Sequence, residues 1–372
     1  MHLSSLALLI PFAALEWPTQ GWKTSTPEAE NVDAEALEAL HRDLASGKHG
    51  YVDGIVVIRN GRIVFEKSYS HDYDRLFEGG ARGPYNYYDT DWHPYYRKGP
   101  LHTMQSVSKS VTSALIGIAR EKGALPELDA PVLPLFEGFR TRSDDPAWRA
   151  VTLRHLLTMT SGIEWDESTV AYTDPKNSCA AMEGSENWVQ FVLDQKMAAE
   201  PGKTFVYNSG VTELLGQILK SATGQDPDAY AGEHLFPPLG IEEWYWKKTP
   251  TGLSDTEGGL YLTARDLAKI GYLYLKDGVW EGKRILPRGW VSESTAPAVV
   301  AGRERQYGFQ WWLLPYEGRE RSWAAAALGY GGQLLFVVPD YDLVAVFTGW
   351  NIYGEPSLSA QLALERVIDS VR

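Results

Sequence analysis

The sequence predicts an α/β fold of the α+β kind, in which an antiparallel sheet flanked by helices is built from both chain termini. An all-helical lobe is inserted between the two halves of the sheet. Two observations predict the sheet: residues 54–68 and residues 331–349, near opposite ends of the chain, each have the pattern of a β-hairpin. A third predicts the lobe, because residues 124–235 alternate helical patterns with turns and contain few strand signals. A cleft between two such lobes is the usual place for a site.

The first hairpin is the clearest local signal in the chain. Two apolar or alternating runs flank Asn60-Gly61, a residue pair preferred in type I′ turns because both central positions need a positive φ. The second hairpin turns at Pro339-Asp340. Before the first hairpin, apolar residues spaced by three and four predict an amphipathic helix over residues 33–46.

Three further helices are predicted. One begins at about Ser106 and ends at Gly123, one covers residues 259–275 with Thr263 as a plausible N-cap, and one closes the chain over residues 355–370. Residues 71–100 are rich in Tyr, His, Asp, Gly and Pro, and we expect a long, packed, irregular loop.

These elements divide the chain into two expected domains. Residues 21–123 and 236–372 form the α/β domain, and residues 124–235 form the helical domain. Residues 1–20 are an N-terminal segment in which residues 3–15 are apolar and as long as the core of a signal peptide. No Lys or Arg precedes this core and no clean A-x-A site follows it. Periplasmic or secreted location is the prediction, and cytoplasmic location is the alternative. The segment is too short to span a bilayer as a helix.

Composition excludes several classes of function. The chain has 372 residues, of which 44% are hydrophobic, so it can bury a large core. Its net charge of −13, with no stripe of Lys or Arg, argues against a nucleic-acid partner. The single cysteine, Cys179, forms no internal disulfide, and the histidines lack metal-ligand spacing. We therefore expect no metal and no cofactor; His102 is expected to be structural.

Ser106 and Lys109 form the only S-x-x-K motif of the chain. Positions i and i+3 share one face of a helix, so the amine reaches the hydroxyl. The pattern predicts that this face points away from the main packing face, and that free N–H groups at the helix N-terminus favour negative charge there. A neutral lysine base needs its pKa lowered from about 10.4 to near 7. Taken alone, the motif is weak, and a solvated helix start would be the preferred interpretation. The apolar stripe on the other face is Val107, Val111, Ala114, Leu115 and Ile118.

Over about residues 50–370 the chain resembles the serine β-lactamase-like family, which includes penicillin-binding peptidases, β-lactamases, esterases and some amide hydrolases. The resemblance depends on several segments in the family's order, which together are far more specific than S-x-x-K. They are SVSKSVTSALIGIA at 106–119, VTLRHLLTMTSGI at 151–163, PGKTFVYNSG at 201–210, LFPPLGI at 235–241, GGLYLTARDLAKIG at 258–271 and GYGGQLLFVVPDYDLVAVFTG at 329–349.

The resemblance implies the roles of the site residues. Ser106 is the nucleophile, Lys109 its proton acceptor and Tyr207 a second acid/base. Ser209 takes the place of the usual Asn of the Y-x-N loop, so the orientation of the substrate is expected to differ from that in true β-lactamases. No metal enters this mechanism.

The largest departure from the family lies on the strand that borders the site. The family has K-T-G or H-x-G there, whereas this chain has Gly329, Tyr330 and Gly331 without a basic group. A cation at this position would help to hold a substrate carboxylate. The resemblance implies an oxyanion hole from the N–H of Ser106 and one N–H near Tyr330, and such donors are each worth about 3 kcal/mol in the barrier.

The expected function is hydrolysis of an ester or amide bond of a small molecule through an acyl-enzyme on Ser106. The alternatives are D-alanyl peptidase-like or weak β-lactamase activity, and a penicillin-recognising sensor that is acylated without turnover. The sequence does not specify the acyl group, the leaving group or the oligomeric state.

Overall fold

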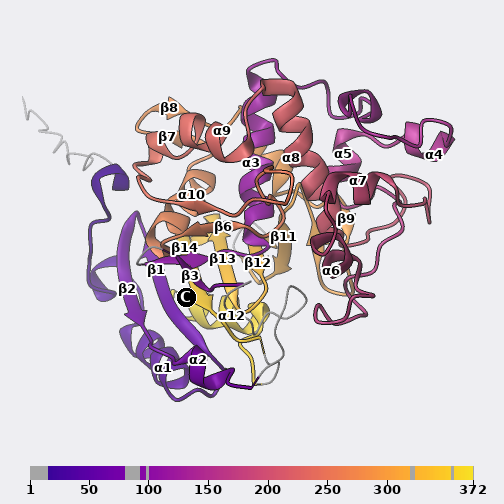
Figure 1. The fold of residues 1–372 in the computed structure, drawn as a ribbon. Helices are drawn as coiled ribbons and strands as arrows, with labels where there is room; N and C mark the ends of the chain where they lie inside the picture. Colours follow the sequence, from indigo (N-terminus) through magenta and orange to yellow (C-terminus); the bar gives the residue numbers. More distant parts are fainter. Residues whose placement is uncertain (1–15, 80–92, 98–99, 319–322, 353–355, 372) are drawn as a thin grey trace, which may run out of the picture.

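A computed structural model describes residues 16–79, 93–97, 100–318, 323–352 and 356–371. Its central feature is an eight-stranded antiparallel sheet, in which the first and last strands of the chain are neighbours (Figure 1). The predicted sheet from both chain termini is therefore confirmed. Its strands, in spatial order, are β2 (Arg62–Ser68), β1 (Val52–Arg59), β14 (Leu343–Gly349), β13 (Gln333–Val338), β12 (Trp323–Gly329), β11 (Trp312–Pro315), β10 (Gln306–Tyr307) and β9 (Val299–Val300).

Both predicted hairpins are present. β1 and β2 are joined at Asn60 (φ 52°) and Gly61 (φ 77°), the two positive angles that a type I′ turn needs. β13 and β14 are joined by a short 3₁₀ turn over Pro339–Tyr341. The register of β1 against β14, with Arg59 opposite Leu343, fixes the two ends of the chain side by side.

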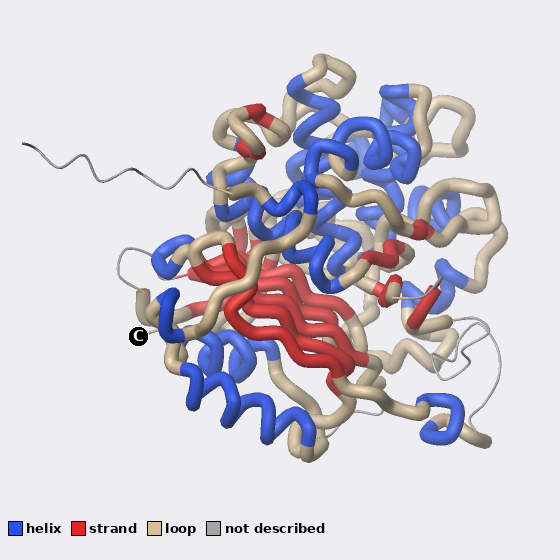
Figure 2. The backbone as a smooth tube through the Cα atoms, turned by 90° about the vertical axis from the view of Figure 1, so that its left-hand side faces the viewer, coloured by secondary structure: helices blue, strands red, loops and turns tan. Residues whose placement is uncertain are grey.

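Helices cover both faces of the sheet (Figure 2). On β1, Ile55 and Val57 join the apolar core under α1 (Ala34–Ala45) and α12 (Ala360–Asp369), whereas Val56 and Ile58 join the core on the opposite face. The opposite face is covered by α10 (Ala264–Leu275), and α3 (Val107–Glu121) contacts β12 and β13. Because both faces are covered, β13 and β14 are buried at every residue and almost continuously apolar.

Other helices pack around α3 and α8 (Ser209–Thr223). Within residues 124–235, all of which the structure describes, there is no named strand, as the sequence predicts. The exact domain boundaries stay a prediction. The helices of this region, besides α8, are α4 (Pro146–Arg149), α5 (Leu153–Leu157), α6 (Ser178–Glu183), α7 (Trp188–Leu193) and α9 (Pro227–His234). Of these, α5, α6, α7 and α9 contact α8, and α9 also contacts α3.

The structure also contains two smaller sheets and two short helices. A four-stranded sheet has the order β3 (Tyr96–Arg97), β4 (Leu101–Thr103), β6 (Leu260–Leu262) and β5 (Tyr245–Trp246), and β7 (Val279–Trp280) pairs with β8 (Lys283–Arg284). The helices are α2 (Tyr73–Leu76) and α11 (Trp290–Ser294).

Three expectations about helices need correction. The helix predicted over 259–275 starts only at Ala264, because Leu260–Leu262 pairs as β6 with strands distant in sequence; Thr263 is its N-cap, as expected. The closing helix starts at Ala360, after the N-cap Ser359. The expected free face of α3 is wrong: all residues from Val107 to Ala119 are buried, since other elements pack around the whole helix.

Residues 1–15 and most of the predicted loop at 71–100 lie outside the described residues, so the export signal and the packing of that loop stay predictions. Among the described residues, no helix is both long enough and apolar enough to cross a membrane.

Replacing Leu364 with Ala tests the packing of α12 on the sheet. Leu364 is 0% exposed, and its truncation should lower the free energy of unfolding by about 2–5 kcal/mol, because it leaves a cavity. Glu365, the next residue, is exposed, and Glu365→Ala should change the free energy of unfolding by less than about 0.5 kcal/mol. Urea unfolding measures both; equal effects would contradict this packing.

Candidate active site

Ser106, the predicted nucleophile, stands at the start of α3. It is the N-cap residue, but its side chain does not cap the helix. Gln105 before it has a φ of +47°, in the left-handed region that non-glycine residues rarely adopt, and its amide donates to Oγ1 of Thr103 at 3.0 Å. This sharp turn between β4 and α3 leaves Ser106 partly exposed, while Lys109, one helical turn on, is 1% exposed.

The ammonium of Lys109 contacts three oxygen atoms. Nζ donates to Oγ of Ser106 at 2.9 Å, to the backbone carbonyl of Glu257 at 2.7 Å and to Oε2 of Glu257 at 3.0 Å. An ammonium group has three N–H donors, so this geometry uses all of them. The structure thus brings the S-x-x-K pair together, as the helical spacing predicts.

The charge state of Lys109 differs from the expectation. Burial acts to lower the pKa of Lys109, but the charges of Tyr207, Glu257 and Glu167 outweigh it, and the pKa lies well above its ordinary value. The expected lowering is therefore wrong for the resting site, because the sequence did not show that buried acids surround the amine. Lys109 is a cation here.

Tyr207 lies against the same pair. The ammonium of Lys109 is 5.3 Å from the centre of its ring. Burial raises the pKa of Tyr207, whereas Lys109 and the neighbouring Ser106 act to lower it. The ring also stacks on Trp312, with centroids 5.5 Å apart and planes 27° apart.

The segment at 151–163 holds the tyrosine loop in place. The N–H of Val206 donates to the carbonyl of Met159 at 2.9 Å, and Gly202 donates to Thr160 at 2.7 Å. Gly162, with a φ of +78°, lets this turn approach the chain so closely that a Cβ there would lie 2.3 Å from the carbonyl of Ala199. The family resemblance of these two segments thus has a structural reason.

Ser209 is buried and its donors are engaged. Its N–H and its Oγ each donate to the carboxylate of Glu167 at 2.8 Å. Glu167 also accepts from Trp165 at 2.5 Å and from Tyr172 at 3.1 Å. The hydroxyl proton of Ser209, which we expected to orient a substrate, is therefore committed to Glu167.

The glycines of the bordering strand permit close approaches. A Cβ on Gly329 would lie 2.5 Å from the carbonyl of Met104, so the end of β12 packs directly against the chain leading into Ser106. Gly331 has a φ of +82°, and a Cβ there would lie 2.9 Å from the ring of Trp350. The ring of Tyr330 lies 5.2 Å from that of Tyr172. β12 carries no basic residue.

Sequence reasoning missed the acids of the site, notably Glu167, Glu183 and Glu257. Glu257 directly precedes the segment GGLYLTARDLAKIG, but a lone acid beside a motif is ordinarily solvated, and nothing in its sequence context indicates burial. Cys179 is 1% exposed, and burial raises the pKa of its thiol well above the usual range. Such a thiol is a poor nucleophile. His102 is buried, with its Nε2 3.0 Å from a carboxylate oxygen of Asp53.

Comparisons with known proteins agree with this arrangement. Residues 43–351 match the family described as Beta-lactamase. The 6-aminohexanoate-dimer hydrolase of Paenarthrobacter ureafaciens is 26% identical over 283 residues, which cover 68% of each chain. Two solved structures share the fold. A penicillin binding protein from Bacillus halodurans has a TM-score of 0.64 at 18% identity, over 90% of this chain and all of that one. A family VIII carboxylesterase has a TM-score of 0.67 at 15% identity, and the match covers 94% of this chain and 98% of that one.

Fold and sequence together define an enzyme of the serine hydrolase class. The chain belongs to the Beta-lactamase family, whose profile matches most of its length. It is a hydrolase of the serine β-lactamase type, as the family resemblance implied.

Replacing Gly329 with Ala should displace the backbone around Met104 and Ser106, because the added methyl would overlap the carbonyl of Met104. Misplacement by about 1 Å can cost 100-fold in rate, so kcat/KM for p-nitrophenyl butyrate should fall by about 10–100-fold. Gly258→Ala is the control, because a Cβ at Gly258 would lie 3.8 Å from its nearest neighbour, an atom of Gln105. Equal kinetics in the two variants would contradict the tight packing of β12 on this turn.

Proposed function

We propose that this enzyme hydrolyses an ester or amide bond of a small, uncharged substrate through an acyl-enzyme on Ser106. The observation that carries the proposal is the 2.9 Å contact between Nζ of Lys109 and Oγ of Ser106, with the ring of Tyr207 centred 5.3 Å from the same Nζ. Ser106 is partly exposed, so a substrate carbonyl can reach it, while its two partners lie deeper or to the side. Nucleophilic catalysis needs this combination of an accessible hydroxyl and adjacent proton-transfer groups.

The reaction follows in two halves. The Lys109–Tyr207 pair takes the proton of Ser106 as Oγ forms a bond to the substrate carbonyl carbon. The same pair returns a proton to the leaving oxygen or nitrogen as its bond to carbon breaks, which leaves the acyl-enzyme. Water then attacks the acyl carbon, gives up one proton to the pair, and Oγ leaves with that proton, which restores the resting serine.

The oxyanion of each tetrahedral intermediate needs preorganised donors. We propose the N–H of Ser106, at the N-terminus of the 15-residue helix α3, and an N–H near Tyr330. The close packing of Gly329 on Met104 supports this pair, since it draws the end of β12 to the serine. Backbone donors at a helix N-terminus favour developing negative charge.

A cavity beside Tyr207 supports the choice of an uncharged substrate. It has a volume of about 530 Å³, and its wall includes the aromatic rings of Trp165, Phe205 and Trp312. Among the described residues that line it, Asp166 and Glu167 are the charged ones. Aromatic walls suit an apolar group, and two carboxylates disfavour an anionic one.

The relatives support both bond types. The name 6-aminohexanoate-dimer hydrolase points to an amide substrate, and the carboxylesterase to an ester. The absence of a basic residue on β12 favours either over the carboxylate-bearing substrates of peptidases and β-lactamases.

Ser106→Ala should lower turnover of p-nitrophenyl butyrate by at least about 1,000-fold, because no other group forms the acyl-enzyme. Intact-mass analysis should detect the butyryl adduct, trapped by rapid acid quench, in the wild type only. Ser113→Ala makes the same change two turns further along α3 and should retain activity. Undiminished turnover in Ser106→Ala would remove the nucleophile assignment; a stable adduct without turnover in the wild type would instead favour the sensor.

Substrate charge gives a second test. Mono-p-nitrophenyl succinate has a carboxylate on an acyl chain close in length to that of p-nitrophenyl butyrate. We expect kcat/KM for the butyrate ester to be at least about 10-fold higher, since about 1.4 kcal/mol of repulsion from Asp166 and Glu167 suffices for that ratio. A preference for the succinate ester, or rapid hydrolysis of a chromogenic cephalosporin, would point to the peptidase or β-lactamase alternative.

A further inference from the structure

Glu257 holds Lys109 from the side opposite Ser106. Its backbone carbonyl and its carboxylate both accept from Nζ, at 2.7 and 3.0 Å. The side chain of Lys109 is 1% exposed and that of Glu257 is 6% exposed, so water screens this ion pair weakly. The charge of Glu257 therefore acts on Lys109 at contact distance.

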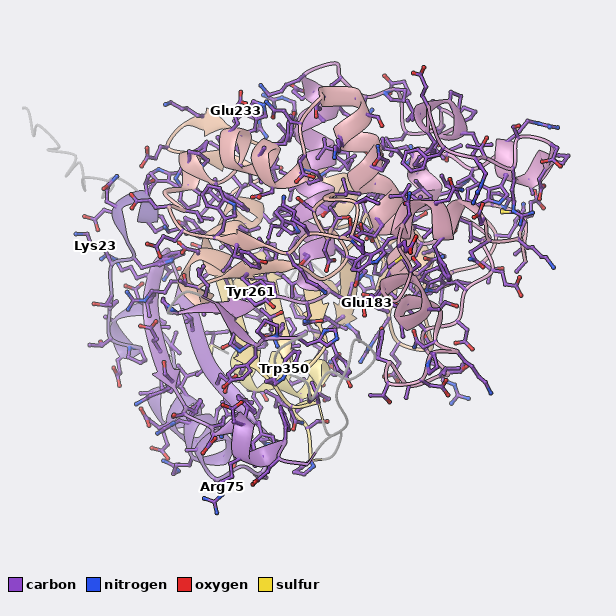
Figure 3. All side chains as sticks on the ribbon, in the orientation of Figure 1. Lys23, Arg75, Glu183, Glu233, Tyr261 and Trp350 are labelled. Carbon is purple, nitrogen blue, oxygen red and sulfur yellow. The ribbon has the colours of Figure 1, made fainter. Side chains whose placement is uncertain are left out.

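Glu183 lies next to Glu257. Glu183 belongs to α6 and is labelled in Figure 3. A ligand oxygen of Glu183, one of Glu257 and the sulfur of Cys179 all lie within 4.8 Å of one another. A hydrogen bond joins the two carboxyl groups.

The two carboxyl groups are driven to opposite charge states. Burial, together with Glu257, raises the pKa of Glu183 well above its usual range. Burial also acts on Glu257, but Lys109 and the hydrogen bond from Glu183 outweigh it, and the pKa of Glu257 is lowered. These directions favour the proton on Glu183 and the negative charge on Glu257.

Other charged and titratable groups surround this pair. Asp255 and Lys247 form an ion pair at 3.5 Å, and burial raises the pKa of Asp255 to about 6. Glu213 on α8 accepts from the N–H of Glu257 at 2.9 Å, and burial raises its pKa well above the usual range. The remaining groups that interact with Glu257 or share a small cavity with it are Glu167, Tyr172, Cys179, Tyr207, His93 and Tyr261.

We propose that Glu257 is a positioning residue: its carbonyl and carboxylate hold the amine of Lys109 against Ser106 and set the pH range in which the Lys109–Tyr207 pair exchanges a proton with that serine. This inference rests on the proposed hydrolysis and names a residue that controls its proton-transfer pair.

The contact geometry supports this role. Nζ of Lys109 lies 2.9 Å from Oγ of Ser106, and two oxygens of Glu257 lie 2.7 and 3.0 Å from the same Nζ. The carboxylate of Glu257 therefore acts on Lys109 at contact distance and favours the protonated form of the Lys109–Tyr207 pair.

The test is the pH dependence of kcat/KM in two matched variants of the full-length enzyme. Glu257→Gln removes a negative charge beside the Lys109–Tyr207 pair. Without that charge, the protonated forms of the pair are less stable. Both limbs of the profile for p-nitrophenyl butyrate should move to lower pH, by about one to three units. Glu183→Gln makes the same chemical change in a carboxyl group whose raised pKa favours the neutral form, and its limbs should stay within about 0.3 unit of the wild type.

A role in packing alone would lower kcat/KM at every pH and move neither limb. Unmoved limbs in Glu257→Gln, or an equal shift in Glu183→Gln, would overturn the proposal. Glu257→Asp keeps the charge and should return the limbs toward their wild-type positions, even where kcat is reduced.

A second measurement does not depend on activity. Urea unfolding of Lys109→Met, Glu257→Gln and the double variant forms a double-mutant cycle. Each single change leaves one buried group without its partner, so the double variant should be more stable than the sum of the single effects predicts. Additive effects would refute the pairing. If the wild type turns over no ester or amide, the proposed function fails, and this cycle still tests the role of Glu257.

Discussion

The buried ammonium of Lys109 is the constraint on which the rest of the site depends. An isolated charge in a protein interior costs several kcal/mol, and this one is tolerated because every N–H has an acceptor. Those acceptors come from two places far apart in the sequence, the start of α3 and the chain before β6. A serine hydroxyl is thereby held at a fixed distance from a cation. The same charge also draws Tyr207 toward ionisation, against the effect of burial.

The fold meets this constraint by making α3 a central helix with polar residues inside. Gln310 is an example: its carbonyl accepts from Ser110 at 2.6 Å, its side-chain oxygen accepts from Thr212 at 2.9 Å, and its amide donates to Leu156 at 2.9 Å. One buried glutamine therefore connects α3, α8 and α5. Satisfied polar contacts of this kind specify one arrangement of the helices around the nucleophile, which apolar packing alone does less well.

Local patterns predicted the parts of the structure that local forces decide. Asn60-Gly61 predicted a hairpin because the turn needs positive φ at both residues, and Thr263 predicted a helix start because its side chain caps one. Prediction failed where distant partners decide. Leu260–Leu262 has a helical pattern but pairs with β4 and β5. Motif order identified Ser106, Lys109 and Tyr207, whereas nothing near Glu257 in the sequence shows that an ammonium lies beside it.

The pairing of β1 with β14 has a consequence for the order of folding. These neighbours in the sheet are separated by most of the chain, from Arg59 to Leu343. During synthesis, β1 and β2 emerge from the ribosome long before β14 exists. Until β14 is made, β1 lacks this neighbour in the sheet. The helices between them can associate earlier, through contacts between residues closer in sequence. Closure of the central sheet is thus a late event, and the interval before it is when the exposed edge of β1 is most open to association with another chain.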